Sequence, residues 1–357
     1  VSMSEFWRNR HVMITGVGGF IGANLAHLLC EKSALVWGID AVAESACLRA
    51  MGVNRQRAVI RRDIRDFDSL HFTLRHGDLS HNWSQTPEII FHLAGQSHIA
   101  QSQMRPLETF DVNVRGTWNV LEACRDLPSL RAMVAASSNH VFGSLPKARV
   151  PTCALGHRAY PAIKQDSVRQ AWLEDDPCQQ TDIYGTSKGM VDLLVRSYGA
   201  MGLPVAALRH VNCFGPADPH RSHLVTGTIC DLLEGKAPII RSDGTPLKAY
   251  LHVEDVCRAY LLVAESLVNG AILPGAAVHA SGSPRSVVAL VEAILGVSGT
   301  ALVPKILGED ASQSGYVEIL DDSRLRSLGW APRPLHEGLL ETYNWYKEHG
   351  GAQWLSQ

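Results

Sequence analysis

The chain has 357 residues, a formal net charge of −2 and a hydrophobic content of 46%. That length and apolar content allow one large domain or two ordinary domains with a sizeable core. A net charge near zero gives no reason to expect a nucleic-acid or anionic-membrane partner. The apolar runs are short and are interrupted by charged residues, so we expect no membrane-spanning segment.

The eight cysteines are scattered along the chain and include no Cys-x-x-Cys pair. Zinc clusters and disulfide frameworks both prefer closer or more regular spacing. We therefore predict free thiols, a cytoplasmic location and no metal site.

The first part of the chain alternates short apolar stretches with longer helical patterns. The expected strands are His11–Thr15, Ala34–Ile39, Ala58–Ile60, Ile89–Leu93, Met133–Ser137 and Val205–Leu208. The expected helices are Phe20–Cys30, Phe67–Arg75, Thr109–Asp126 and Lys188–Met201. This alternation is typical of βαβ units, so we predict an α/β fold with a Rossmann-type, doubly wound parallel sheet.

The pattern changes after Asn212, where Gly, Pro and Asp separate shorter elements. Such a change is expected of a smaller C-terminal lobe. The stretch Val253–Ser266 is rich in Val, Leu and Ala and is predicted to return to the first lobe as a helix. We therefore predict a first domain of residues 1–212 completed by 251–280, and a second lobe of residues 213–250 and 281–357.

A glycine-rich stretch, Thr15-Gly16-Val17-Gly18-Gly19-Phe20-Ile21-Gly22, follows the first strand and opens the first helix. Gly16 allows the tight turn, Gly19 lets backbone amides approach a pyrophosphate, and Gly22 lets the helix pack closely on the strand. The helix N-terminus then faces the negative charge. Because the glycines stand between a strand and a helix, we predict a dinucleotide site that also includes Phe20 and Ile21.

Asp40 ends the second expected strand, roughly 20 residues after the glycines. A carboxylate at this position can accept hydrogen bonds from both hydroxyls of the adenosine ribose. It would repel a phosphate on that ribose, and no Arg immediately follows it. The predicted cofactor is therefore NAD rather than NADP.

The ends of the third and fourth strands complete the predicted cofactor site. Asp63 and Ile64 close the third strand, where an adenine could rest between the acid and the apolar side chain. His92, inside the fourth strand, is interpreted as a core histidine with satisfied hydrogen bonds. The residues that follow it and leave room for the cofactor's diphosphate and ribose are Leu93, Ala94 and Gln96.

The stretch Tyr184-Gly185-Thr186-Ser187-Lys188 places a phenol and an ammonium group on one face of a helix. An unperturbed tyrosine has a pKa of about 10 and is a poor base at neutral pH. A neighbouring Lys⁺ and the positive nicotinamide ring would lower that pKa. We predict that Tyr184 removes a hydroxyl proton while hydride leaves the same carbon, and that Lys188 also binds the nicotinamide ribose.

With these motifs, the chain resembles the extended short-chain dehydrogenase/reductases of the nucleotide-sugar epimerase and dehydratase family, from Phe6 to about Tyr346. The stretch Ile229–Glu265 is most similar to the branch that contains CDP-glucose 4,6-dehydratases. The resemblance implies NAD in the first lobe, a nucleoside diphosphate sugar in the second, and a homodimer formed through the helices Thr109–Asp126 and Lys188–Met201. Its further markers are Phe91–Ala94, Asp111–Thr117, Ser137–Gly143, Arg209–Pro216, Tyr250–Val256 and Leu328–Pro332.

The resemblance also implies which residues contact the substrate. Ser138 matches the family's catalytic hydroxyl, and Asn212 matches a contact to the diphosphate or sugar. Lys248 stands where relatives usually carry an Arg that binds the substrate diphosphate. Relatives tend to carry a second such Arg in the segment that corresponds to Glu309–Val317, and this chain has none there. Arg221 is a speculative substitute for it. The predicted substrate-binding residues are Gln96, Ser138, Asn139, Asn212, Arg221 and Lys248.

Asn139 and His140 depart from the family's dehydratases, in which these two places hold an acid and then Glu or Lys. There the acid protonates the departing hydroxyl of carbon 6, and the base removes the proton from carbon 5. An Asn cannot act as a general acid, whereas a His can be an acid or a base near neutrality. The pair therefore retains half of the elimination machinery. The predicted catalytic residues are Ser138, Asn139, His140, Tyr184 and Lys188.

Several functions follow from this set. We rank first an epimerase, in which a transient keto sugar is reduced from the other face. A dehydratase or carbon-5 epimerase that uses His140 as base ranks second, and a decarboxylase of a uronic-acid sugar third. Two further alternatives are a catalytically idle nucleotide sensor and an NADPH-consuming reductase. The intact Ser138, Tyr184 and Lys188 argue against the sensor. Asp40 argues against the reductase.

The connection from Gly143 to Tyr184 is long and carries mixed charge. Connections of this length are usually functional or mobile. We expect either a lid over the sugar or a surface insertion without a catalytic role.

Overall fold

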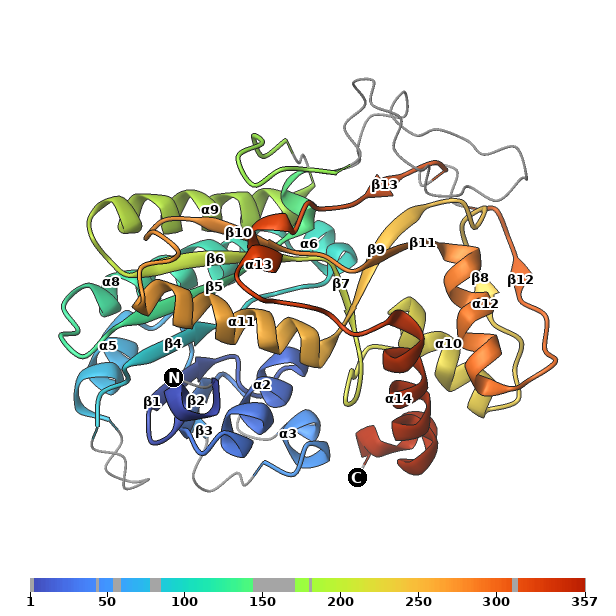
Figure 1. Ribbon diagram of the computed structural model, residues 1–357, viewed down its shortest axis with the longest axis horizontal. Coiled ribbons are helices and arrows are strands. Elements are labelled where there is room, and N and C mark those ends of the chain that lie inside the picture. The colour runs from blue at the N-terminus through green and yellow to red at the C-terminus, as the bar shows by residue number, and fades with distance from the viewer. Residues whose placement is uncertain are drawn as a thin grey trace.

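A computed structural model of the chain describes residues 3–42, 45–53, 59–77, 85–143, 171–179, 182–309 and 314–356 (Figure 1). Its largest element is a seven-stranded parallel sheet in the order β10-β6-β5-β4-β1-β2-β3. The strands are β1 His11–Thr15, β2 Leu35–Asp40, β3 Val59–Arg61, β4 Ile89–His92, β5 Ala132–Ser138, β6 Val205–His210 and β10 Ala277–Ala280. The predicted parallel, Rossmann-type sheet is confirmed.

Helices cover both faces of this sheet. Along β1, Val12 and Ile14 pack into the core cluster that contains residues of α2 and α11, whereas Met13 packs into the cluster of α5, α8 and α9. Neighbouring residues of a strand point to opposite faces, so a strand buried on both faces is a continuous apolar run. The helices are α2 Phe20–Glu31, α5 Phe67–His76, α8 Gly116–Arg125, α9 Ile183–Ala200 and α11 Val253–Val268.

Two helices differ from their predicted bounds. The expected helix Thr109–Asp126 consists of α7 (Pro106–Phe110), a π-helical turn (Asp111–Arg115) and α8. Helix α9 begins five residues before the expected Lys188, because Asp182 caps it by accepting a hydrogen bond from the backbone N–H of Gly185. Tyr184 and Lys188 therefore both lie in the first two turns of one helix.

The C-terminal part of the chain forms a smaller sheet in the order β11-β9-β13, with β7 also paired to β9. Its strands are β7 Asn212–Phe214, β9 Leu247–His252, β11 Ser283–Ser286 and β13 Val317–Glu318; β8 Ile239–Ile240 and β12 Lys305–Ile306 form a separate pair. Figure 1 shows α10 (Leu224–Leu233), α12 (Val287–Ser298) and α14 (Leu335–Glu348) at the end of the molecule opposite to α5 and α8. The domain boundaries at residues 212, 250 and 280 stay a prediction.

Short elements complete the described chain: α1 Met3–Trp7, α3 Ala46–Ala50, α6 Ile99–Met104, α13 Ser323–Ser327, and the 3₁₀ turns Asn139–Val141 and Gly351–Ser356. Within the described ranges, no helix combines the length and the apolar character needed to cross a bilayer. Residues 144–170, most of the connection that is predicted as a lid or an insertion, lie outside the description.

Candidate active site

The glycine turn after β1 packs directly on the end of β4. Gly16 has a φ of +71°, and a Cβ atom there would lie 2.7 Å from the backbone nitrogen of Ala94. A Cβ atom at Gly22 would lie 2.2 Å from the carbonyl oxygen of Gly16. Both positions therefore need glycine, the first for its backbone conformation and the second for the close approach of α2 to the turn.

The N-terminus of α2 carries no side-chain cap, since its N-cap residue is Gly19. Its first amides are therefore available to an anion, and the helix dipole favours negative charge there. The backbone N–H of Gly18 donates a hydrogen bond of 2.9 Å to Oδ2 of Asp40, which joins the predicted ribose-binding acid to the glycine turn. The arrangement fits a dinucleotide with its pyrophosphate on α2 and its ribose on Asp40. By contrast, α5, α9 and α12 are capped by Asp66, Asp182 and Ser286.

Asp63 has a partner that the sequence reasoning missed. Its carboxylate accepts hydrogen bonds from Nε (3.0 Å), Nη2 (2.6 Å) and the backbone N–H (2.9 Å) of Arg65, and this side-chain contact lowers the pKa of Asp63. Ile64 is buried and packs closely on Gly116. A Cβ atom added to Gly116 would lie 2.4 Å from Cδ1 of Ile64. Asp63 thus already has a hydrogen-bond partner in Arg65. The contact of Asp63 and Ile64 with an adenine stays a prediction.

His92 is buried within a continuous chain of hydrogen bonds, as interpreted from the sequence. Ala94 N–H donates to the hydroxyl of Thr15 (3.2 Å), which lies 2.7 Å from His92 Nδ1. On the other side, His92 Nε2 lies 2.9 Å from the hydroxyl of Thr117, which donates to the carbonyl of Asn113 (2.5 Å). Each donor finds one acceptor if Nε2 carries the hydrogen. Burial lowers the pKa of His92 to about 3, so this ring is neutral and structural.

Asn113, in the π-helical turn, ties the end of β4 to the helix that carries Tyr184. Its Oδ1 accepts from the backbone N–H of Gln96 (2.7 Å), and its Nδ2 donates to the carbonyl of Gln96 (3.0 Å) and to the hydroxyl of Ser187 (2.9 Å). Ser187 in turn donates to the carbonyl of Tyr184 (2.7 Å). Oε1 of Gln96 is buried and has no hydrogen-bond partner among the described residues. That free acceptor suits the predicted position of Gln96 beside a ligand.

Ser138, Tyr184 and Lys188 meet where β5 ends. All three side chains are buried, and the hydroxyls of Ser138 and Tyr184 form a hydrogen bond. Nζ of Lys188 donates to the carbonyl of Ala136 at 2.9 Å. Burial lowers the pKa of Lys188 to about 8.

The pKa of Tyr184 differs from the expectation that Lys188 would lower it. Burial raises this pKa to about 12, and the hydrogen bond with Ser138 opposes the rise only in part. The physical reason is that the phenol is buried, which disfavours the charged phenolate. The described residues therefore favour the neutral phenol of Tyr184, and a bound nicotinamide ring would add the positive charge that the expectation also included.

Asn139 and His140 form the 3₁₀ turn directly after β5. The hydroxyl of Ser138 accepts from the backbone N–H of His140 (3.1 Å) and donates to Oδ1 of Asn139 (3.2 Å). The imidazole of His140 meets the ring of Tyr184 edge to face, with 5.7 Å between the ring centroids. The structure thus brings the predicted catalytic residues together at one sheet edge; their chemical roles stay predictions.

One face of the second sheet is directed at this turn. Lys248 of β9 lies opposite Glu318 of β13 and opposite Arg285 of β11, and Tyr250 of β9 lies opposite Asn212 of β7. Residues paired across strands, and residues two apart on one strand, share a face of a sheet. These side chains therefore belong to one surface, which includes the predicted substrate contacts Asn212 and Lys248.

Glu318 joins that surface to the 3₁₀ turn, and sequence reasoning missed it. Its carboxylate is fully buried and lies 3.4 Å from Nε2 of His140 and 3.9 Å from Nζ of Lys248. Lys248 is consequently a partly buried member of the site and not a solvated surface lysine. The available sequence signal was a single charged residue inside the apolar run Val317–Leu320.

Arg221, the predicted substitute for a missing phosphate-binding Arg, already has carboxylate partners. Its guanidinium pairs with Asp231 of α10 (2.9 Å) and with Glu234, which directly follows that helix (2.5 Å). Its contact with the substrate stays a prediction. Arg285 is exposed, shares the face of Lys248, and forms no ion pair among the described residues. We therefore add Arg285 to the candidates for neutralising a diphosphate.

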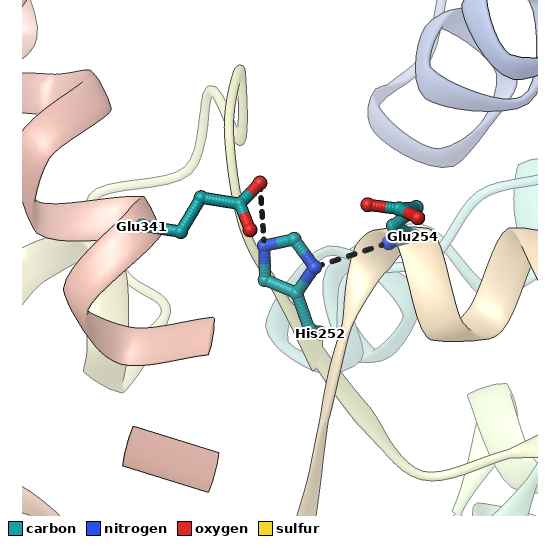
Figure 2. A group of neighbouring side chains, drawn as sticks. All are labelled: His252, Glu254 and Glu341. Carbon is teal, nitrogen blue, oxygen red and sulfur yellow. Dashed lines mark hydrogen bonds and ion pairs between the residues drawn. The ribbon is translucent and has the colours of Figure 1, made fainter. Parts of the chain in front are cut away.

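A second cluster of titratable side chains, His252, Glu254 and Glu341, lies where α14 approaches the start of α11 (Figure 2). Their ligand-type atoms lie within 4.8 Å of one another. The guanidinium of Arg333 pairs with both glutamates and with Asp255. Burial, with Arg333 nearby, lowers the pKa of His252 to about 3. Because the guanidinium groups of Arg333 and Arg258 pair with these carboxylates and with Asp255, the cluster is an ion-pair network.

Comparison with known proteins agrees with the fold and the motifs. Residues 12–273 match the family described as the NAD dependent epimerase/dehydratase family. A CDP-glucose 4,6-dehydratase of Salmonella typhimurium is 25% identical over 366 residues, which cover 96% of this chain and 92% of that protein. The crystal structure of a UDP-glucose 4-epimerase from Thermotoga maritima with UDP-glucose has a TM-score of 0.76 at 23% identity, covering 94% of this chain and 98% of that one. At that identity the likeness shows the fold alone.

A trifunctional UDP-glucose 4,6-dehydratase/UDP-4-keto-6-deoxy-D-glucose 3,5-epimerase/UDP-4-keto-L-rhamnose-reductase of Arabidopsis thaliana is 24% identical over 355 residues. These residues cover 96% of this chain, which spans only 48% of the Arabidopsis protein's length. The matched family model extends over well more than half of this chain. With the glycine turn, Asp40 and the Ser138–Tyr184–Lys188 group in place, the chain belongs to the NAD dependent epimerase/dehydratase family.

Proposed function

We propose that this chain is an NAD-dependent epimerase of a nucleoside diphosphate sugar, which works through a transient keto sugar and recycles its bound cofactor. The observation that carries the proposal is the buried Ser138–Tyr184 hydroxyl pair with Lys188. It lies at the carboxyl end of β5, on the same sheet edge as the glycine turn and Asp40. Ligands bind at that edge in doubly wound folds.

In this proposal, each residue of the site has a separate role. The amides at the start of α2 would hold the pyrophosphate of NAD, Asp40 its adenosine ribose, and Lys188 its nicotinamide ribose. The bound cofactor would supply a reversible hydride acceptor for the sugar carbon. Tyr184 removes the proton of the sugar hydroxyl, and Ser138 hydrogen-bonds the reacting oxygen.

Epimerisation at the oxidised carbon is the first candidate outcome. It needs a hydroxyl proton acceptor and a cofactor, and no acid for a leaving hydroxyl. Asn139 stands where such an acid would be needed, and its amide can only hydrogen-bond. Nδ2 of Asn139 is buried without a partner among the described residues, which suits a donor directed at substrate.

A 4,6-dehydratase is the second candidate, favoured by one observation. The imidazole of His140 lies beside Tyr184 and within 3.4 Å of the buried carboxylate of Glu318. A histidine held by a carboxylate is a competent base for a proton next to a ketone. Several of the chain's relatives, such as the Salmonella typhimurium protein, are dehydratases by name. Decarboxylation of a uronic-acid sugar remains third.

We also propose that the chain works as a homodimer. Leu107 of α7, Trp118 of α8, and Met190 and Leu193 of α9 expose large apolar side chains. Exposed apolar groups that gather on neighbouring helices are typical of protein interfaces. These are the helices through which the family resemblance implies dimerisation.

A reducing cytoplasm is the proposed location. All cysteines among the described residues are free. Several are buried, and burial raises the pKa of the thiols of Cys47 and Cys230 to about 11. Such thiols are unreactive side chains of a core and need no disulfide partner.

The function is tested by incubating the protein with CDP-, UDP-, dTDP- and GDP-sugars without added dinucleotide. We expect one sugar to be converted, with many turnovers per protein molecule and no net change in reduced cofactor. Binding without conversion of any sugar would support the idle sensor, and conversion that occurs only in a parallel incubation with NADPH, and consumes it, would support the reductase. Either result would refute the proposal.

A further inference from the structure

Glu318 is a buried charge that the proposed steps at Tyr184 do not use. It lies on the two-residue strand β13, and its side chain is fully buried. Neither carboxylate oxygen has a hydrogen-bond partner among the described residues. Burying a carboxylate is unfavourable unless opposite charge lies nearby. Its ion-pair partners among the described residues are His140 at 3.4 Å from Oε1 and Lys248 at 3.9 Å from Oε2. Besides burial, its charge also contributes to raising the pKa values of Tyr184, Tyr250 and Tyr316.

The two partners of Glu318 are held in place by different parts of the fold. Lys248 is its neighbour in the β9–β13 register, so this contact is set by the sheet. His140 comes from the other lobe, at the end of β5, and its backbone N–H is held by the hydroxyl of Ser138. The carboxylate thus connects the second sheet to the turn that carries the catalytic hydroxyl.

The contact with Glu318 bears on which nitrogen of His140 carries a hydrogen. The 3.4 Å approach is an ion-pair contact without hydrogen-bond geometry, and a carboxylate beside Nε2 favours a hydrogen on that nitrogen of the neutral ring. Nδ1 then retains its lone pair, and it forms no hydrogen bond with the residues that the structure describes. The ring plane is fixed further by its edge-to-face contact with Tyr184, at an interplanar angle of 70°. A histidine with one nitrogen on a carboxylate and the other free is an oriented base.

We propose that Glu318 is a positioning residue, which orients His140 and stabilises its protonated ring, so that His140 removes the proton from the carbon next to the keto group. The inference rests on the proposed function, since that proton becomes acidic only after the neighbouring hydroxyl has been oxidised. In the step, the C–H bond breaks and its proton goes to Nδ1. The electron pair forms the carbon–carbon double bond of an enolate, and the keto oxygen becomes its oxyanion.

The enolate can react further in two ways. If a proton returns to the carbon from the other face, the product is inverted there and His140 gives up its extra proton. If instead carbon 6 carries a hydroxyl, the C=O bond re-forms, the enolate electron pair makes a double bond between carbons 5 and 6, and the carbon 6–oxygen bond breaks. The proton on His140 leaves with that hydroxyl as water. A bound reduced cofactor would then return its hydride to carbon 6, and carbon 5 would take up a proton. One residue can then serve as both base and acid, and Asn139 needs only to hydrogen-bond. The pair therefore adds chemistry at the carbon next to the ketone to the keto-sugar step of the proposed function.

The test uses Glu318→Gln, which keeps the shape of the side chain and removes its charge, in heavy water with a sugar that the wild-type protein converts. Two quantities are measured: the rate at which the bound cofactor is reduced, and the rate at which deuterium enters the carbon next to the ketone. We expect cofactor reduction to change less than about 3-fold and deuterium entry to fall about 100-fold or more, as for general bases and their carboxylate partners.

His140→Gln should likewise retain cofactor reduction and lose deuterium entry. The double variant should lose little more of the deuterium-entry rate than either single variant, because the effects of two residues that act as one unit are not additive. The matched control is Glu265→Gln, which alters a half-buried carboxylate that accepts from Trp7 in α1. It should leave both rates unchanged. Retained cofactor reduction in Glu318→Gln shows that the variant is folded.

The outcomes separate this inference from the proposed function. Deuterium entry within a few-fold of wild type in Glu318→Gln, or an equal loss of both rates, would overturn the role of Glu318 and leave the keto-sugar mechanism standing. A wild-type protein that reduces its cofactor but incorporates no deuterium would do the same. A wild-type protein that never reduces its cofactor with any sugar would remove the proposed function, and the inference with it.

Discussion

Replacing Tyr184 with Phe is expected to lower kcat by about 1,000-fold, within the range found for general acid–base groups. The substitution removes the phenol oxygen that takes the hydroxyl proton in the proposed mechanism, while the ring remains to pack against His140. The affinity for NAD should change little, because we propose that the cofactor's pyrophosphate and adenosine ribose bind at α2 and Asp40. Steady-state conversion of the sugar and equilibrium titration with NAD measure the two quantities separately.

The matched control is Tyr198→Phe on the same helix. Tyr198 is also largely buried, and its hydroxyl donates to Glu122 at 2.8 Å. Its loss should cost about 1 kcal/mol of unfolding free energy and leave kcat within about 3-fold. If Tyr184→Phe kept most of its activity, the assignment of Tyr184 as the base would be wrong. The buried Ser138 or Lys188 would then have to take its role.

Replacing Gly22 with Ala should weaken NAD binding by about 10-fold or more and lower the free energy of unfolding by about 1–3 kcal/mol. A Cβ atom there would lie 2.2 Å from the carbonyl oxygen of Gly16 and 2.9 Å from Cα of Val17. Both are backbone atoms, so α2 must move away from the turn. The amides that face the pyrophosphate would move with it. Titration with NAD and thermal unfolding without NAD provide the two measurements.

Gly296→Ala is the matched control, since Gly296 also lies in a helix, α12, with nothing within 4 Å of an added Cβ. There the change should raise stability by about 0.5–1 kcal/mol, because Ala loses less conformational freedom than Gly on forming a helix. NAD affinity should stay unchanged. Unaltered NAD binding in Gly22→Ala would contradict the placement of the pyrophosphate at this turn.

The main sheet could be predicted because its strands are buried on both faces. Such strands appear in the sequence as apolar runs, and β1 has the predicted bounds His11–Thr15. The break in the expected helix Thr109–Asp126 could not be predicted. It is a π-helical turn whose Asn113 bonds to Gln96 and Ser187, and neither contact is visible in local periodicity. The earlier start of α9 had a local signal, the capping residue Asp182, which the prediction did not use.

The candidate site likewise contains residues that could be predicted from the sequence and residues that could not. Residues that follow strands of the main sheet, such as Asp40 and Ser138, could be found because parallel strands end at one edge. Glu318 could not, because its place depends on the register of a two-residue strand with β9, far from any motif. Burial raises the pKa of Tyr184 to about 12, a contribution that the reasoning from Lys188 and the nicotinamide ring did not include.

The most direct test of the keto-sugar mechanism is rapid mixing of the purified protein with a sugar that it converts, while the absorbance of reduced cofactor is followed in a single turnover. The mechanism predicts that bound NAD is reduced and then reoxidised as product forms, with no net change at the end. Conversion of the sugar with no reduced cofactor at any time would contradict it. Reduced cofactor that accumulates and is never reoxidised would contradict it as well.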